Sequence, residues 1–138
     1  MKRIAIAGCA HIHTPNFVKT LKERKDLQVA GVWDHDSLRA RENAEILNTQ
    51  GYDSDTEIWN DPSIDAVVIC AETNRHKELV LRAAEAGKHM FVEKPLGFAA
   101  KDALEMADAI EKAGVLFQTG YFMRGNPVHL FLKQQIEA

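Results

Sequence analysis

The sequence has few of the features that mark secreted, fibrous or membrane-spanning proteins. Its two cysteines, Cys9 and Cys70, cannot form a disulfide framework, which favours a reducing cytoplasm. Eight glycines and four prolines among 138 residues are too few for collagen or for a disordered linker. The longest uninterrupted apolar run, Ala66–Ala71, has the length of a strand and falls far short of the roughly 18 residues of a membrane helix. We therefore expect a cytoplasmic protein with no membrane segment.

The chain also lacks a strong excess of charge of either sign. It carries 17 basic and 20 acidic side chains, for a formal net charge of -3. This balance gives no electrostatic reason to expect nucleic acid or an anionic membrane as a partner. A length of 138 residues, 46% of them apolar, suits a single domain with a genuine core.

Short β-rich runs alternate with stretches of helical periodicity along the chain. Strands are predicted at Lys2–Ala7, Leu27–Trp33, Ala66–Cys70, His89–Val92 and Leu116–Thr119. Helices are predicted from Thr14, from Ser37 to about Leu47, from about Asn74 to Ala86, from about Lys101 to Ala113 and from Asn126. The polar segment Gly51–Pro62 is expected to hold one helical turn near Ile58 and Trp59. This alternation predicts an α/β fold, a Rossmann-like doubly wound parallel sheet with its ligand crevice at the carboxyl ends of the strands.

Local signals set the helix ends. Thr14 and Ser37 are predicted to cap the first two helices, and Asn126 is predicted to cap the last one. Proline follows both Thr14 and Asn126, at the first position of a helix, where its missing N–H costs nothing. Gly87 and Gly114 stand where glycine is preferred after a helix.

The turn after the first strand is a candidate phosphate-binding loop. It reads Gly8-Cys9-Ala10-His11-Ile12-His13, and of the dinucleotide pattern G-x-G-x-x-G it keeps only the first glycine. Ala10 is small enough to let the backbone approach a pyrophosphate, whereas His13 requires looser packing or a side chain that turns away. The loop lies between a predicted strand and a predicted helix, which is the context that a dinucleotide site requires.

Asp34 is the candidate ligand of an adenosine ribose. It ends the second predicted strand, 21 residues beyond His13, close to the ~20-residue spacing typical of the acid in this role. A carboxylate there accepts hydrogen bonds from both ribose hydroxyls and repels a 2′-phosphate. The next cationic residue is Arg39, so the sequence favours NAD over NADP. The alternative is that Asp34 only caps the turn into the next helix.

His11 and His13 form an H-x-H pair, which is also compatible with a metal-dependent hydrolase. That architecture requires about 250 residues and further ligands on later strands. The remaining histidines, at positions 35, 76, 89 and 129, show no convergence on the pair in the predicted fold. We therefore expect no metal, and a histidine-lined cofactor loop.

Glu93-Lys94-Pro95 follows the predicted strand His89–Val92 and so lies at the same sheet edge as the Gly8 turn. Lys94 can perform acid–base chemistry if burial or a nearby cation lowers its pKa. An X-Pro bond at this place can adopt the cis form. The alternative is an exposed ion pair on a loop.

These residues resemble the Gfo/Idh/MocA oxidoreductases, the group of glucose–fructose oxidoreductase and inositol dehydrogenase. The resemblance rests on Glu93-Lys94-Pro95, on His76 and Glu85–His89 before it, and on Gly120–Arg124 after it. It covers the whole chain and corresponds to the family's N-terminal domain. It implies hydride transfer between a nicotinamide cofactor and a sugar- or polyol-like hydroxyl.

The resemblance also implies a role for each site residue. Gly8, Ala10, His11, Ile12 and His13 would cradle the pyrophosphate, and Asp34 would bind the adenosine ribose. Ala71, Glu72 and Thr73 would flank the cofactor, with His76 in the helix behind them. Glu93 would lie near the nicotinamide ribose, and Lys94 near the reacting carbon as the catalytic residue. Arg124 completes the expected cofactor-binding set. Ala71-Glu72-Thr73 replaces the family's usual T-P-N and adds a carboxylate.

The resemblance further implies that the domain spans residues 1–120, and that residues 121–138 begin the connection to a second domain. The last predicted helix meets no stop signal before Ala138, so we expect the chain to continue. The second domain would supply most of the substrate pocket and the interface of a homo-oligomer. Because two of the three loop glycines are absent, a non-catalytic Rossmann module or partner subunit remains the alternative function.

Overall fold

The computed structural model describes residues 1–138 and contains one six-stranded, wholly parallel sheet. The strands lie in the order β3-β2-β1-β4-β5-β6. Their bounds are β1 Lys2–Ala7, β2 Leu27–Trp33, β3 Gln50–Gly51, β4 Ala66–Ile69, β5 His89–Val92 and β6 Phe117–Thr119. The helices are α1 Thr14–Glu23, α2 Ser37–Ile46, α3 Thr56–Asn60, α4 Thr73–Glu85, α5 Ala100–Ala113 and α6 Pro127–Glu137, with a 3₁₀ turn at Phe122–Gly125. The predicted doubly wound α/β fold is confirmed.

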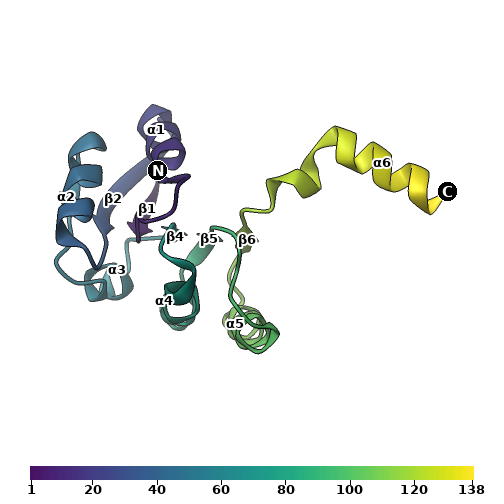
Figure 1. Ribbon diagram of the computed structural model, residues 1–138. Helices are drawn as coiled ribbons and strands as arrows, with labels where there is room; N and C mark the ends of the chain where they lie inside the picture. The colour runs from purple at the N-terminus through teal and green to yellow at the C-terminus, as the bar shows by residue number, and fades with distance from the viewer.

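Helices cover both faces of the sheet, as Figure 1 shows, with α1 and α2 on one side and α4 and α5 on the other. Because side chains alternate between faces along a strand, β1 contributes to both layers. Ala5 and Ala7 join the larger core, which contains Leu79 of α4 and Met106 of α5. Ile6 joins the smaller core beneath α1 and α2. Small residues on one face of β1 therefore let α4 pack close to the sheet.

Two of the predicted helix caps are wrong. Thr14 is the first residue of α1, and His13 holds the cap position without a side-chain hydrogen bond. The Thr14 side chain is buried instead. Asp36, not Ser37, caps α2, and its carboxylate accepts from the backbone amides of Leu38 and Arg39. A carboxylate one residue earlier reaches these amides with the geometry that a serine at the first helical position cannot offer.

Other predicted helix ends are confirmed. The Asn126 side chain accepts a hydrogen bond from the amide of Val128 and caps α6. Gly114 ends α5 with a φ of 64°, in the left-handed region where glycine carries no Cβ penalty. The turn expected near Ile58 and Trp59 is present as α3.

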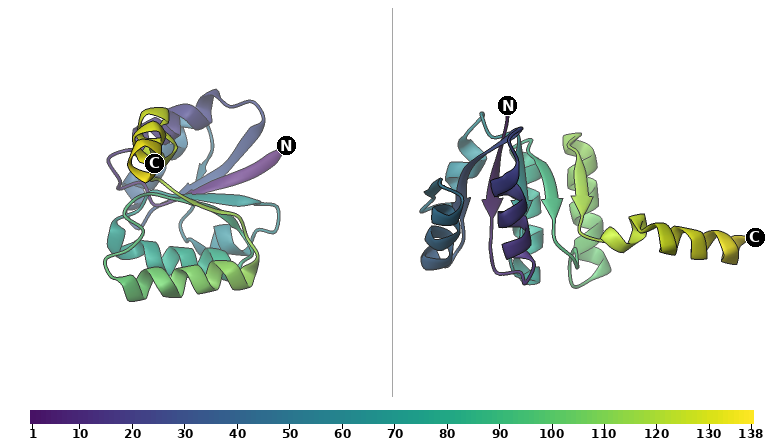
Figure 2. Two further views of the ribbon diagram at one scale, coloured as in Figure 1. Left: turned by 90° about the vertical axis from the view of Figure 1, so that its right-hand side faces the viewer. Right: turned by 90° about the horizontal axis from the view of Figure 1, so that it is seen from above.

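The last segment leaves the sheet after β6. The 3₁₀ turn and α6 extend away from the rest of the domain, as Figure 1 and the right view of Figure 2 show. Large apolar side chains on α6, among them Phe131 and Ile136, are exposed. No helix in the structure combines the length and apolar character required to cross a membrane.

Candidate functional site

The carboxyl ends of β1, β2, β4 and β5 meet at one edge of the sheet, and backbone hydrogen bonds connect the loops that follow them. The amide of Gly8 donates to the carbonyl of Trp33 over 2.7 Å, which joins the ends of β1 and β2. The amide of His11 donates to the carbonyl of Cys70 over 2.8 Å, which joins β1 to β4. Nδ1 of His13 lies 3.2 Å from Oε1 of Glu93, which connects the same loop to β5. The structure therefore gathers the Gly8 turn and Glu93-Lys94 at one edge, as the sequence predicted.

Gly8 has a φ of 86° and lies against the turn after β4. A Cβ at this position would lie 2.4 Å from Cβ of Ala71 and 2.7 Å from its Cα. Only glycine fits both the backbone angle and the space, which explains why this one glycine of the pattern is kept. Ala71 itself is buried.

The loop exposes two backbone donors. Among the hydrogen bonds of this turn, the amides of Cys9, His11 and His13 donate to protein atoms, whereas those of Ala10 and Ile12 donate to none. The Ile12 side chain is 82% exposed. Free amides next to the N-terminus of α1 favour a bound anion because the helix dipole adds to them.

Asp34 is held by four hydrogen bonds and its side chain has no exposed surface. Oδ2 accepts from the amide of Cys9 over 2.6 Å and from Nε of Arg39 over 2.9 Å. Oδ1 accepts from the amide of Asp36 over 2.8 Å and from Nη2 of Arg39 over 2.7 Å. Burial acts to raise the pKa of Asp34, but the hydrogen bonds from Arg39 and the two amides outweigh it and leave the pKa below its usual value.

Arg39 contacts the candidate site, although from the sequence it was only the next cationic residue after Asp34. Its guanidinium donates hydrogen bonds to both oxygens of the Asp34 carboxylate. The signal was available, because a residue five positions after Asp34 falls in the first turn of the next helix. Nη2 of Arg39 also donates to Oε1 of Glu72 over 3.1 Å. Hydrogen bonding to Asp34 raises the pKa of Arg39.

Glu72 brings the turn after β4 into this cluster. Its Oε1 lies 3.6 Å from Nε2 of His35, and its Oε2 lies 4.0 Å from Nε of Arg75. Thr73 follows as the first residue of α4. The carboxylate at position 72 therefore shares the Arg39 guanidinium with Asp34.

Glu93 lies between the two histidines of the loop. Its Oε1 lies 3.2 Å from Nδ1 of His13 and its Oε2 lies 3.8 Å from Nε2 of His11, while the amide of Lys94 donates to Oε2 over 2.8 Å. The Glu93 side chain is 3% exposed. Burial lowers the pKa of His11, and Glu93 partly opposes this shift. A Cβ on Gly120 would come within 2.9 Å of the carboxylate, so Gly120 makes room for it.

Lys94 is half-buried, and its amine makes no hydrogen bond or ion pair. The Lys94–Pro95 peptide bond is cis, as the sequence allowed. His76 lies behind it, with Nδ1 2.9 Å from the carbonyl oxygen of Pro95 and Nε2 3.1 Å from that of Ala71. Because His76 has no exposed surface, it positions these two turns and presents nothing to a ligand.

Arg124 is separate from the other predicted residues. It is exposed in the 3₁₀ turn that leads to α6, and its side chain makes no hydrogen bond or ion pair with the residues of the sheet edge.

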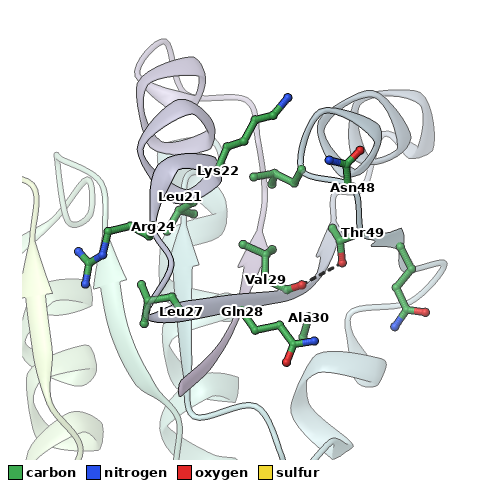
Figure 3. Close-up of a pocket in the computed structure, with 11 residues that line it drawn as sticks. Leu21, Lys22, Arg24, Leu27, Gln28, Val29, Ala30, Asn48 and Thr49 are labelled. Carbon is green, nitrogen blue, oxygen red and sulfur yellow. Dashed lines mark hydrogen bonds between the residues drawn. The ribbon is translucent and has the colours of Figure 1, made fainter. Parts of the chain in front are cut away.

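A polar hollow of about 480 Å³ lies at the opposite end of β2 (Figure 3). There Oγ1 of Thr49 donates to the carbonyl of Val29 over 3.0 Å, and the lining holds none of the predicted site residues.

Comparison with known proteins gives close relatives over the full chain. Myo-inositol 2-dehydrogenase of Thermotoga maritima is 35% identical over 136 residues, which are 98% of this chain and 40% of that protein. Scyllo-inositol 2-dehydrogenase (NAD(+)) of Bacillus subtilis is 31% identical over 140 residues, which cover 99% of this chain and 40% of that protein. The chain thus spans about 40% of the length of these relatives.

Solved structures have the same fold. The crystal structure of an NAD-binding protein from Listeria innocua is 29% identical, with a TM-score of 0.82 over 99% of this chain and 40% of that one. A 3-ketoreductase from Actinomadura kijaniata in complex with NADP is 22% identical and shares the fold, with a TM-score of 0.84 over 99% of this chain and 44% of that one. The profile of the oxidoreductase family with an NAD-binding Rossmann fold matches residues 2–121. The chain therefore belongs to the Gfo/Idh/MocA oxidoreductase family and contains its NAD-binding Rossmann fold.

Proposed function

We propose that this chain is the cofactor-binding part of a dehydrogenase that transfers hydride between NAD and a sugar- or polyol-like hydroxyl. The observation that carries the proposal is the shared sheet edge, where the Gly8 turn with its two free amides lies beside Glu93 and Lys94. The names of the inositol dehydrogenase relatives support the substrate class.

The residues of the turn fit a dinucleotide. The cofactor phosphates would lie on the free amides of Ala10 and Ile12, in the space that Gly8 keeps open beside Ala71. Ala71, Glu72 and Thr73 would border the cofactor from the neighbouring turn. Glu93 would hold the nicotinamide ribose. The nicotinamide, when bound, supplies the hydride acceptor or donor.

Lys94 is the proposed catalytic residue. Its amine makes no ion pair, and the contact between Nδ1 of His76 and the carbonyl oxygen of Pro95 holds the adjoining backbone. The ammonium group would bind the substrate hydroxyl and stabilise the alkoxide that develops as its proton leaves. Arg124 remains a proposed cofactor contact that would require its segment to lie closer to the sheet edge.

We also propose that NAD is preferred over NADP. A 2′-phosphate at the end of β2 would meet two carboxylates, those of Asp34 and Glu72, with the single guanidinium of Arg39 already shared between them. Ribose hydroxyls, by contrast, can donate hydrogen bonds to Asp34 once the guanidinium of Arg39 has moved away from one of the two carboxylate oxygens. Glu72, 3.1 Å from Nη2, offers the displaced guanidinium another carboxylate.

The domain organisation follows the same proposal. Residues 1–120 would form the cofactor domain, and residues 121–138 would lead to a substrate domain, through which the whole protein would form a homo-oligomer. The free, buried thiols of Cys9 and Cys70 favour the cytoplasm as its location.

Titration with NADH and with NADPH, followed by the fluorescence of Trp33 at the end of β2, tests the proposal. We expect saturable binding that is tighter for NADH. Asp34→Ala should weaken NADH binding at least about tenfold, because the variant loses a charged partner of the ribose hydroxyls. Asp26→Ala is the matched control, since Asp26 is exposed and pairs only with Arg24. Absence of binding at millimolar NADH would favour a non-catalytic module.

A further inference from the structure

The side chains of His11, His13 and Glu93 converge at the sheet edge where the sequence placed the Gly8 turn and Glu93 together. Each offers one ligand atom, and these atoms all lie within 4.8 Å of one another. From this geometry we propose that the loop after β1 and the end of β5 form a binding site for one divalent transition-metal ion of the zinc type.

The separations are close to those of a metal centre. Tetrahedral zinc with bonds of about 2.0–2.2 Å to nitrogen and oxygen places its ligand atoms roughly 3.3–3.6 Å apart. The two carboxylate oxygens of Glu93 lie 3.2 Å from Nδ1 of His13 and 3.8 Å from Nε2 of His11. These two distances involve different oxygens of Glu93, and the single ligand atoms of the three residues lie within 4.8 Å of one another, so rotation of the side chains would be needed to complete the three-ligand arrangement.

The burial of the Glu93 carboxylate is a second reason to expect a metal ion at this site. Its side chain is almost wholly buried, and no lysine or arginine amine or guanidinium lies within ion-pair distance of its carboxylate. Buried charges in proteins are normally paired or coordinate a metal. The only side chains paired with it are the two imidazoles, which bind a metal in their neutral form.

The site also has room for a further ligand. His13 and Glu93 border a pocket of about 360 Å³ that is lined as well by Thr119 and Gly120. Oγ1 of Thr119 is buried and has no hydrogen-bond partner. Three protein ligands beside an open pocket leave a coordination position for water or for an oxygen of a small molecule.

The chemistry of the donors determines the ion. Two imidazoles and one carboxylate suit zinc, cobalt or nickel, whereas magnesium and calcium take oxygen ligands. Nδ1 of His11 accepts a 3.2 Å hydrogen bond from the amide of His13. Coordination through Nε2 requires the proton of that ring on Nδ1, so this hydrogen bond is the contact that binding would break.

Calorimetric titration of the metal-free, cofactor-free chain with Zn²⁺ tests the site, and visible absorption of added Co²⁺ reports its geometry. We expect one ion per chain, a micromolar or tighter dissociation constant, intensified Co²⁺ bands and an affinity that falls as the histidines protonate. Magnesium should not compete. Glu93 is also the proposed partner of the nicotinamide ribose, so the titration is carried out without a nicotinamide cofactor and its result does not depend on NADH binding.

Glu93→Gln and His13→Gly should each weaken Zn²⁺ binding at least about tenfold, since metal-site substitutions commonly cost that much or more. His129→Ala is the matched control, because that histidine is exposed on α6, and it should bind as the parent does. Circular dichroism checks that each variant is folded, and His13→Gly restores the residue of the dinucleotide pattern if Glu93→Gln does not fold. No Zn²⁺ binding, or equal binding by all variants, would overturn the proposal.

Discussion

Gly8→Ala should destabilise the fold far more than the same substitution at the protein's other left-handed glycines. A residue with a Cβ pays about 1–2 kcal/mol for the left-handed backbone that Gly8 adopts. The new methyl would also lie 2.4–2.8 Å from three atoms of Ala71, where ordinary contacts begin near 3.4 Å. Ala71 is buried and its backbone atoms cannot rotate away, so the ends of β1 and β4 must separate.

Overpacking of this kind costs about 1–3 kcal/mol, which gives a total loss of about 2–5 kcal/mol in the free energy of unfolding. For a chain of 138 residues the unfolding entropy converts this into a fall in Tm of roughly 7–17 °C. Thermal unfolding followed by far-UV circular dichroism measures the shift, and urea unfolding gives the free energy.

Gly87→Ala separates the cost of the left-handed backbone from the cost of the close contact with Ala71. Gly87 has a φ of 66°, but a Cβ there meets no atom within 4 Å. Gly87→Ala should therefore lower the free energy of unfolding by only the conformational cost, about 1 kcal/mol. Gly125→Ala should lower it less, because Gly125 has neither a left-handed backbone nor a close neighbour. If Gly8→Ala and Gly87→Ala lower the unfolding free energy by the same amount, the close contact with Ala71 contributes nothing and the reasoning is wrong.

Two further predictions concern the acidic cluster. Glu72→Gln should reduce the preference for NADH over NADPH by roughly three- to tenfold, because it removes one negative charge near the proposed 2′-phosphate position. Competition binding with the two cofactors measures the ratio of their dissociation constants, and an unchanged ratio would contradict this prediction. Asp34→Asn should lower the unfolding free energy at neutral pH by about 1–3 kcal/mol. Because the pKa of Asp34 is lowered in the folded state, its stabilisation is complete above the unfolded pKa of about 4 and is lost as the pH falls through the folded value. Urea unfolding of both proteins across this range should show the difference shrinking in acid, and a constant difference would refute the assignment.

Much of the sheet could be predicted because its strands are buried on both faces. Leu27–Trp33 and His89–Val92 have the predicted bounds, and the continuous apolar run Ala66–Ala71, which is typical of a parallel strand, contains β4. Gln50–Gly51 was missed. It has two exposed residues and pairs only at the sheet edge with Gly31 and Val32, so it carries no apolar pattern that could reveal it.

The direction of long side chains could not be predicted in the same way. The spacing placed Asp34 at the end of β2, but an arginine has several rotatable bonds, and its partners depend on the backbone of three loops. Arg39 turns back onto Asp34 and also reaches Glu72, 33 residues away in the chain. The position of Arg39 in the sequence therefore did not reveal its contact with Asp34, and the proposed preference for NAD depends on how Asp34 and Glu72 share its guanidinium.

His13 replaces a glycine of the dinucleotide pattern, and only the folded chain shows what its side chain contacts. The sequence required its side chain either to loosen the packing of α1 or to turn away, and the structure turns it toward Glu93, 80 positions later. In the order β1-β4-β5, the loop after β1 can reach the end of β5 only across the end of β4. The residues there are Cys70 and Ala71, both small and buried, so His13 and Glu93 can meet above them. A histidine in place of a loop glycine thus adds an imidazole to a buried carboxylate. The predicted topology brought the two segments to one sheet edge, whereas the contact between these two side chains became visible only in the folded chain.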